Sequence, residues 1–248
     1  MFIWIIAIFI WMYIIPFLII GLFLFFPIFV FVMPVFFVFG ILQYYFNREY
    51  LSSIDYSWWF GQAPAIYLKK KSLICFHPHG ILCTGAVVCI HLKNDTKFAV
   101  APILLNLPIV GLFAKSLGCI EATEMAICNA LKTHSVILCP GGIPELITQE
   151  LYTRRHGFLR IAAKMDVPIL PVLCKTRFYD VIPMPFNDLR LKIAKMGLPI
   201  MFPPLGWYGT WLPKRKAIHI VLLDYFEVNG NIEENRKKYF NLLDRKCI

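Results

Sequence analysis

The sequence predicts an α/β protein, in which a single domain with a central mixed or mostly parallel sheet covered by helices follows a hydrophobic helical hairpin. Three observations lead to this class. Residues 1–46 contain no charged residue, and the charges begin at Arg48, so the chain divides into an apolar segment and a charged domain. Beyond that boundary, short β-rich runs alternate with helical patterns. Several of the runs are apolar throughout, which is typical of parallel strands buried on both faces.

Residues 1–46 are predicted to anchor the chain in a membrane. A bilayer core is crossed by about 20 apolar residues in helical form, so the segment is long enough for two crossings. We interpret it as a helical hairpin, spanning or re-entrant, that turns between Pro16 and Pro27; a tilted helix followed by an interfacial one is the alternative. Residues 47–248 form the second predicted domain. Its early basic residues, from Arg48 onward, predict that it faces the cytosol.

Five segments of the second domain have the composition of buried strands. They are short, rich in Val, Ile, Leu and Phe, and bounded by polar residues, Gly or Pro. Their ranges are 72–76, 97–101, 135–139, 167–173 and 217–223. Their alternation with helices favours a layered domain with a largely buried sheet.

Five further segments carry the periodicity of helices that pack on such a sheet. They lie near 83–92, 108–117, 123–132, 155–165 and 232–245. In the last one, Ile232, Tyr239, Phe240 and Leu243 recur at helical spacing, and we interpret them as packing residues. Residues 177–216 are rich in Pro, Gly and aromatic residues, which predicts a packed surface loop or a membrane-facing cap.

Cysteine usage and net charge limit the compartment and the partners. The eight cysteines include no Cys-x-x-Cys pair, and most lie in apolar runs, which favours free thiols in a reducing compartment over disulfides or zinc. The formal net charge is +10, which suits an anionic membrane surface. Nucleic acid is not an expected partner, because a membrane anchor is predicted.

The stretch HPHG, residues 77–80, is the most specific local pattern in the chain. It follows the predicted strand 72–76, so two imidazoles lie at the carboxyl end of a strand, where ligand sites form in α/β sheets. Pro78 restricts His77 to extended geometry, and Gly80 frees the turn that follows.

Three interpretations of His77 and His79 remain open. In the first, the two histidines are ligands of a metal ion, although the other histidines of the chain show no second pair at such a spacing. Alternatively, they satisfy buried polar groups and have a structural role. The third interpretation is general base catalysis, because an imidazole with a pKa near 6.5 takes a proton from a hydroxyl at neutral pH. We favour the third, with no metal in the site.

A histidine base needs an orienting carboxylate, and the best candidate lies in PGGIPE, residues 140–145. This stretch follows the predicted strand 135–139 as HPHG follows 72–76. Glu145 supplies the carboxylate. Gly141 and Gly142 let the backbone approach a ligand and can present N–H groups to a developing oxyanion. A plain turn with a glutamate in the first turn of a helix is the alternative.

Taken together, these motifs resemble the type-2 diacylglycerol acyltransferases and their monoacylglycerol and wax-alcohol relatives. The resemblance rests on HPHGIL at 77–82, GG..E at 141–145 and RRHGFLRIAAKMDVPILPV at 154–172, in the order and spacing of the family's signature blocks. The apolar N-terminal segment and the C-terminal helix also match. The chain is similar more broadly to the glycerolipid acyltransferase superfamily, which implies an acyltransferase-like domain.

Two departures from the related patterns bear on the acceptor. The superfamily usually has Pro-Glu-Gly-Thr-Arg, whose arginine binds a glycerol phosphate, where this chain has Pro-Gly-Gly-Ile-Pro at 140–144. Loss of a bidentate phosphate ligand favours a neutral acceptor hydroxyl. The type-2 family's Phe-Gly-Glu after the late strand is replaced by Cys174, Lys175 and Thr176.

The resemblance and the residues together imply transfer of a fatty acyl group from acyl-CoA to a neutral lipid, most readily diacylglycerol, to give triacylglycerol. Monoacylglycerol or a long-chain alcohol is the alternative acceptor, and a non-catalytic membrane protein that binds lipid is the alternative class. His77 or His79 is the expected base and Glu145 its partner, with Gly80, Gly141 and Gly142 as the expected oxyanion or acyl-binding positions. Acyl-CoA is a co-substrate, and no cofactor is expected.

The expected contacts with acyl-CoA are in and beside the helix at 155–165. They are Arg154, Arg155, Gly157, Phe158 and Lys164. The family resemblance implies residence in the endoplasmic reticulum membrane, and lipid droplets as a further location. The sequence leaves the oligomeric state open.

Overall fold

The computed structural model describes residues 48–78, 83–148, 151–180, 186–194, 205–210 and 213–247. The predicted hairpin at 1–46 lies outside these residues. Among the helices that the structure describes, none is both long and apolar enough to cross a membrane.

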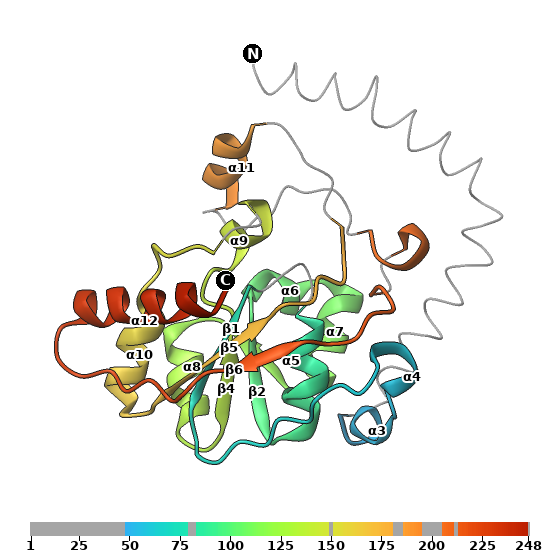
Figure 1. Cartoon of the computed structure of the whole chain (residues 1–248), viewed down its shortest axis with the longest axis horizontal. Coiled ribbons are helices and arrows are strands. Elements are labelled where there is room, and N and C mark those ends of the chain that lie inside the picture. The colour runs from blue at the N-terminus through green and yellow to red at the C-terminus, as the bar shows by residue number, and fades with distance from the viewer. Residues whose placement is uncertain are drawn as a thin grey trace. The chain divides into compact units, whose positions relative to one another are not determined.

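The described strands form one six-stranded sheet in the order β3-β2-β4-β1-β5-β6 (Figure 1). The strands are β1 (Leu73–His77), β2 (Thr96–Val100), β3 (Cys119–Glu121), β4 (Ser135–Leu138), β5 (Ile169–Cys174) and β6 (Ile220–Leu222). The first five are mutually parallel, and β6 pairs antiparallel with β5. The predicted α/β class with a mostly parallel sheet is therefore confirmed.

Strand β1 occupies the middle of the sheet and is buried along its whole length. Leu73 is in register with Val136 of β4 on one side and with Ile169 of β5 on the other. All five residues of β1 are buried. A strand with neighbours on both sides and helices on both faces can carry apolar side chains at every position. This explains why the run before His77 is continuously apolar.

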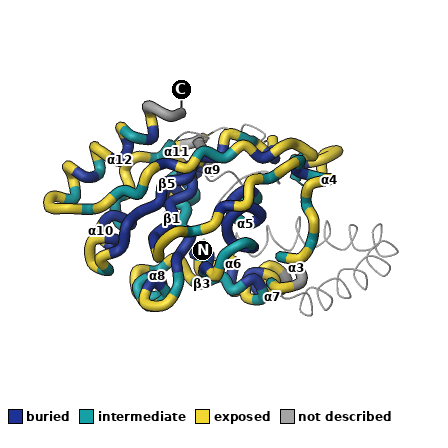
Figure 2. The backbone as a smooth tube through the Cα atoms, turned by 60° about the horizontal axis from the view of Figure 1, so that its bottom comes forward, coloured by how far each residue is buried: buried dark blue, intermediate teal, exposed yellow. Residues whose placement is uncertain are grey.

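Helices cover both faces of the sheet. The described helices and 3₁₀ turns are α3 (Arg48–Ser53), α4 (Ser57–Phe60), α5 (Thr84–Cys89), η2 (His91–Lys93), α6 (Pro102–Asn106), α7 (Pro108–Ser116), α8 (Glu124–Leu131), α9 (Ile143–Thr148), α10 (Gly157–Met165), α11 (Asn187–Ala194), η3 (Trp207–Gly209) and α12 (Ile232–Cys247). One core cluster joins Leu73 and Cys75 to α8, α10 and α12, and the other joins Ile74 and Phe76 to α4 and α5. Figure 2 shows this burial along β1, β5 and α5, with exposed residues on the outer turns of α12.

The predicted elements agree with the structure wherever a pattern was long. All five predicted strands and all five predicted helices have counterparts with shifted ends. Strand β3 was missed because its three residues are not part of a longer apolar run, as those of β6 are, and α6 and α9 because they are short and contain proline. Within the predicted loop or cap at 177–216, the described residues form α11 and η3.

Candidate active site

The candidate site lies where the central strands β1 and β4 end. The two strands are adjacent and parallel, so their carboxyl ends lie at the same edge of the sheet. His77 is the last residue of β1, and the segment from Cys139 to Gly142 connects β4 to α9. Helix α9 carries Glu145 in its first turn. The topology therefore brings the two predicted motifs together.

His77 faces Glu145 in the protein interior. The distance from His77 Nδ1 to Glu145 Oε1 is 3.6 Å, and both side chains are almost fully buried. This distance suits charge attraction but exceeds a hydrogen bond, so Nδ1 has no hydrogen-bond partner among the described residues. A shift of about 0.6 Å would close the bond. Glu145 Oε1 also accepts a hydrogen bond from the Tyr152 backbone N–H at 3.2 Å, which helps to hold the carboxylate.

The second ring nitrogen of His77 faces Tyr239 of α12. His77 Nε2 lies 3.1 Å from the Tyr239 hydroxyl, and Tyr239 is fully buried. In the tautomer with the proton on Nδ1, toward Glu145, Nε2 accepts a hydrogen bond from the Tyr239 O–H. Burial raises the pKa of Tyr239 well above its usual value, and the neighbouring Cys75 and Glu145 add to the rise. The phenol therefore stays protonated and able to donate.

Tyr239 is the residue of this site that the sequence interpretation missed. Its helical spacing with Phe240 and Leu243 indicated only a packing face. Its hydroxyl was the feature that could have pointed to a role beyond packing, because a buried tyrosine O–H needs a hydrogen-bond acceptor. The rings of Phe158, Phe226 and Phe240 surround Tyr239, with centroids 5.0, 5.5 and 5.5 Å away, and fix its position.

The two glycines shape the turn that carries Glu145. A Cβ on Gly141 would lie 1.8 Å from Glu145 Cδ, so the glutamate folds back over a position that only glycine can occupy. Gly142 has φ +56°, a left-handed conformation that favours glycine. Its Cβ would lie 2.6 Å from an Arg155 guanidinium nitrogen. Arg155 is therefore close to this turn.

The predicted oxyanion role of these glycines needs one correction. The Gly142 N–H donates to the Cys139 carbonyl at 3.1 Å, closing the turn, so this N–H group is not available to a substrate oxygen. The Gly141 N–H makes no hydrogen bond to another described residue and remains a candidate donor. His79 and Gly80 lie outside the described residues.

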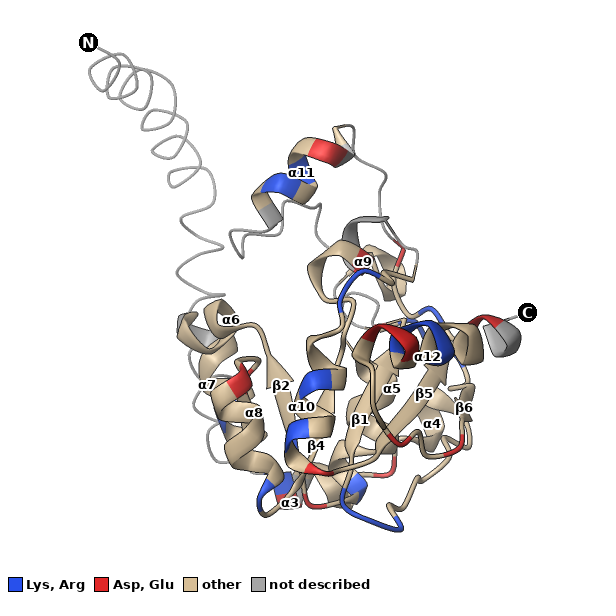
Figure 3. Ribbon diagram, turned by 90° about the vertical axis from the view of Figure 1, so that its left-hand side faces the viewer, with Lys and Arg blue, Asp and Glu red and all other residues tan. Residues whose placement is uncertain are grey.

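The five residues predicted to contact acyl-CoA do not form one surface. Arg154 and Arg155 are exposed in the segment before α10, and Gly157 begins that helix. Phe158 is 3% exposed and packs against Tyr239, so the structure gives it a core role. Lys164 lies in the last turn of α10 and pairs with Glu124 of α8 at 2.9 Å. Figure 3 shows basic residues both along α10 and in the segment before it.

Two cysteines flank the site. The Sγ atoms of Cys83 and Cys139 are 3.1 Å apart, on the segments that follow HPHG and β4 respectively. The hydrogen bond with Cys83 and burial raise the pKa of Cys139 well above its usual value. No group of three histidine, cysteine or acidic side chains that could hold a metal ion occurs in the part of the chain that the structure describes.

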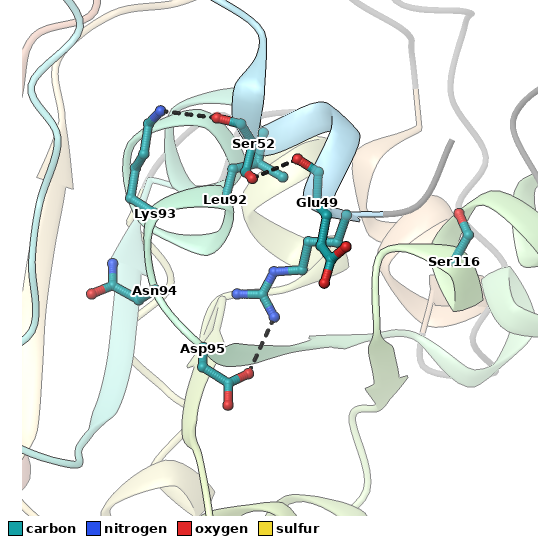
Figure 4. Close-up of a pocket in the computed structure, with 8 residues that line it drawn as sticks. Glu49, Ser52, Leu92, Lys93, Asn94, Asp95 and Ser116 are labelled. Carbon is teal, nitrogen blue, oxygen red and sulfur yellow. Dashed lines mark hydrogen bonds and ion pairs between the residues drawn. The ribbon is translucent and has the colours of Figure 1, made fainter. Parts of the chain in front are cut away.

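A separate cavity of about 510 Å³ lies at the amino end of the sheet (Figure 4). Glu49 and Ser52 of α3 and the segment from Leu92 to Asp95 contribute to its lining. Because Asp95 directly precedes β2, which runs parallel to β4 and β1, this cavity is at the opposite edge from His77. The Arg48 guanidinium in its wall donates to the His91 and Thr96 carbonyls.

The fold is a layered α/β domain with a buried His77–Glu145 pair at the carboxyl ends of its central parallel strands. It is similar to the crystal structure of the 1-acyl-sn-glycerophosphate acyltransferase PlsC from Thermotoga maritima, with a TM-score of 0.53 over 88% of this chain and 92% of that chain. The two sequences are 15% identical, so the likeness shows the fold. No protein-family model matches the sequence.

Proposed function

We propose that this protein transfers a fatty acyl group from acyl-CoA to the free hydroxyl of a neutral lipid. Diacylglycerol is the preferred acceptor, and the product is then triacylglycerol. The observation that carries the proposal is the buried His77–Glu145 pair at the carboxyl ends of two central parallel strands. The similarity of the fold to a solved acyltransferase and the sequence resemblance support it.

His79 is proposed as the general base that meets the acceptor hydroxyl. His77 is fully buried, and its two ring nitrogens face Glu145 and Tyr239. An incoming alcohol would have to displace one of these groups to reach His77. His79 lies two residues further along the sequence. In this proposal, His77 and Glu145 are positioning residues that hold the turn and supply negative charge behind it.

The proposed reaction is a direct transfer. The base removes the hydroxyl proton as the alcohol oxygen attacks the thioester carbonyl, and the CoA thiolate leaves. A thiol with a pKa near 8.5 needs less acid assistance than an alkoxide would. The Gly141 N–H is the proposed donor to the oxyanion. Arg154 and Arg155 beside the glycine turn are the proposed partners of the CoA phosphates.

The proposed acceptor rests on the lack of an arginine within Pro140–Pro144, because the Arg155 guanidinium beside the turn is assigned to the CoA phosphates. The turn supplies no guanidinium of its own to bind an acceptor phosphate, which favours a neutral lipid. Membrane attachment through residues 1–46, in the endoplasmic reticulum, is part of the same proposal, because neutral lipid acceptors dissolve in the bilayer.

The test is transfer of labelled acyl-CoA by membranes that contain the full-length protein. The acceptor panel is diacylglycerol, monoacylglycerol, a long-chain alcohol and lysophosphatidate. His79→Ala is expected to lower kcat about 100-fold or more, the usual contribution of a general base, without changing the unfolding temperature. His77→Ala and Glu145→Ala are expected to lower both kcat and the unfolding temperature. His134→Ala, at the amino end of β4, is the matched control.

Three outcomes would contradict the proposal. Activity that survives in His79→Ala but not in His77→Ala would make His77 the base. Preferential acylation of lysophosphatidate would exclude the neutral acceptor. Folded protein that binds lipid and transfers no acyl group to any acceptor would instead support a non-catalytic lipid-binding protein.

A further inference from the structure

Helices α6 and α7 expose a large apolar surface. Six large apolar side chains within eleven consecutive residues are between 37% and 52% exposed. They form the surface that we call the α6–α7 apolar face, and they are Ile103, Leu104, Leu107, Val110, Leu112 and Phe113. An ordinary surface helix exposes polar residues on its outer side, and an apolar patch of this kind marks a contact site.

The two helices hold this face in a fixed shape. Each begins with a proline, Pro102 in α6 and Pro108 in α7, which suits the first turn of a helix. A Cβ on Gly111 would lie 2.3 Å from the Leu105 carbonyl oxygen, so the helices are in close contact. Leu105 of α6 and Ala114 of α7 are buried. The apolar face is therefore preformed.

The face begins at the same edge of the sheet as the candidate active site, and α7 runs from there toward the amino end, where Ser116 lines the separate cavity. Helix α6 begins two residues after β2 ends, at the carboxyl end of that strand. Strand β4 alone separates β2 from β1, so the two strands are about 10 Å apart. His77 is at the carboxyl end of β1. A membrane surface in contact with α6 would therefore lie at the same edge of the sheet as the site.

The charge of this segment points to a lipid surface. Between Ala101 and Ile120 the single charged residue is Lys115, at the end of α7, and no acidic residue is present. Apolar side chains with a basic residue at the margin suit the interface of a bilayer, where the former enter the acyl region and the latter meets anionic headgroups. A protein partner would be expected to require a polar rim.

We infer that the α6–α7 apolar face inserts into the surface of a bilayer and turns the carboxyl edge of the sheet toward the lipid. This is a second membrane contact, distinct from residues 1–46. It deepens the proposed function, because a lipid acceptor could then reach the site without leaving the membrane. This direction of acceptor entry rests on the proposed function. The membrane contact itself does not require turnover.

Photo-crosslinking of the full-length protein in vesicles tests this inference. The vesicles contain equal amounts of phosphatidylcholine and phosphatidylserine, and no substrate is added. Leu112 is replaced by p-benzoylphenylalanine in one protein and Tyr67 in another. Tyr67 is 72% exposed, and its neighbour Leu68 hydrogen-bonds Asn94 at the amino end of the sheet. Mass spectrometry then identifies what each probe has captured.

Phospholipid adducts at position 112 should exceed those at position 67 about tenfold, since only the former side chain enters the interface. Adding Leu107→Glu to the Leu112 probe protein should reduce its lipid adducts, and adding Met125→Glu on α8 should not. Adducts with residues 1–46 of the same chain, adducts with a second copy, or equal lipid adducts at both positions would each overturn the inference. None of these measurements depends on catalytic turnover, so a negative result here is distinct from a failure of the proposed acyl transfer.

Discussion

The hydroxyl of Tyr239 lies 3.1 Å from Nε2 of His77, although the two residues are 162 positions apart in the chain. Helix α12 therefore contributes a hydrogen-bonding side chain to the buried polar cluster around His77. Together with Glu145 on the other side of the ring, Tyr239 holds the imidazole in one orientation. This relationship makes the last helix part of the candidate site as well as part of the core.

Tyr239→Phe should lower the free energy of unfolding by about 1–3 kcal/mol, because it leaves a buried ring nitrogen without a donor. The phenyl ring and its packing stay in place. Tyr67→Phe makes the same chemical change at an exposed position and should alter stability by less than about 0.5 kcal/mol. Urea unfolding of the full-length proteins in detergent measures both. Equal stability of Tyr239→Phe and the wild type would show that the hydroxyl is not a significant partner of His77.

Gly141→Ala should displace Glu145 from His77, since the added Cβ would lie 1.8 Å from Glu145 Cδ. We expect loss of acyl transfer and destabilisation of about 1–3 kcal/mol, the usual cost of overpacking. Gly141→Ala combined with Glu145→Ala removes the crowded carboxylate. The double variant should unfold at a higher temperature than Gly141→Ala while remaining inactive. A double variant less stable than either single variant would argue against the steric explanation.

His91 should make the fold sensitive to acid. Burial lowers the pKa of His91 to about 4, against the opposing hydrogen bond to the Leu117 carbonyl. The unfolded chain takes up this proton near pH 6.5 and the folded chain only near pH 4. The stability from neutral His91 is therefore complete above about pH 6.5 and is lost as the pH falls toward 4. Between pH 7 and pH 5 the loss is about 2 kcal/mol.

Urea unfolding at pH 7 and pH 5 measures this loss. His91→Gln has no proton to take up at this position, so its stability should fall less over the same interval. His134→Gln is the control, because that side chain is partly exposed. The same pH dependence in His91→Gln and the wild type would assign the acid sensitivity to other groups.

Cys83 and Cys139 should form a disulfide when the protein is treated with oxidised glutathione. Their Sγ atoms are 3.1 Å apart, and a disulfide needs about 2.05 Å, so a small movement suffices. The exchange releases two molecules of reduced glutathione and joins the segment after HPHG to the turn after β4. Peptide mapping should find the 83–139 link in the wild type and in Cys128→Ser, and not in Cys83→Ser. Mixed disulfides with glutathione alone would contradict this prediction.

Much of the fold could be predicted from local patterns, while the connections of the site could not. The apolar runs ahead of His77 and Pro140 indicated two buried strands, and the structure places them side by side as β1 and β4. The hydrogen bond of the Gly142 N–H inside the turn could not be predicted from the sequence. A glycine that opens a site and a glycine that tightens a turn are the same residue in the sequence. Lys164 was grouped with Arg155 by proximity in sequence, whereas it pairs with Glu124 at the far end of α10.

The sequence by itself determined the α/β class and the two motifs that follow the central strands, while the division at residue 46 stays a prediction. Composition, periodicity and turn residues are properties of neighbouring positions, and they constrain local structure directly. Only the tertiary structure decided that Glu145 meets His77, that Tyr239 occupies the other side of the ring, and that α6 and α7 leave an apolar face uncovered. These relationships depend on strand order and helix docking, which arise from packing between residues far apart in the chain.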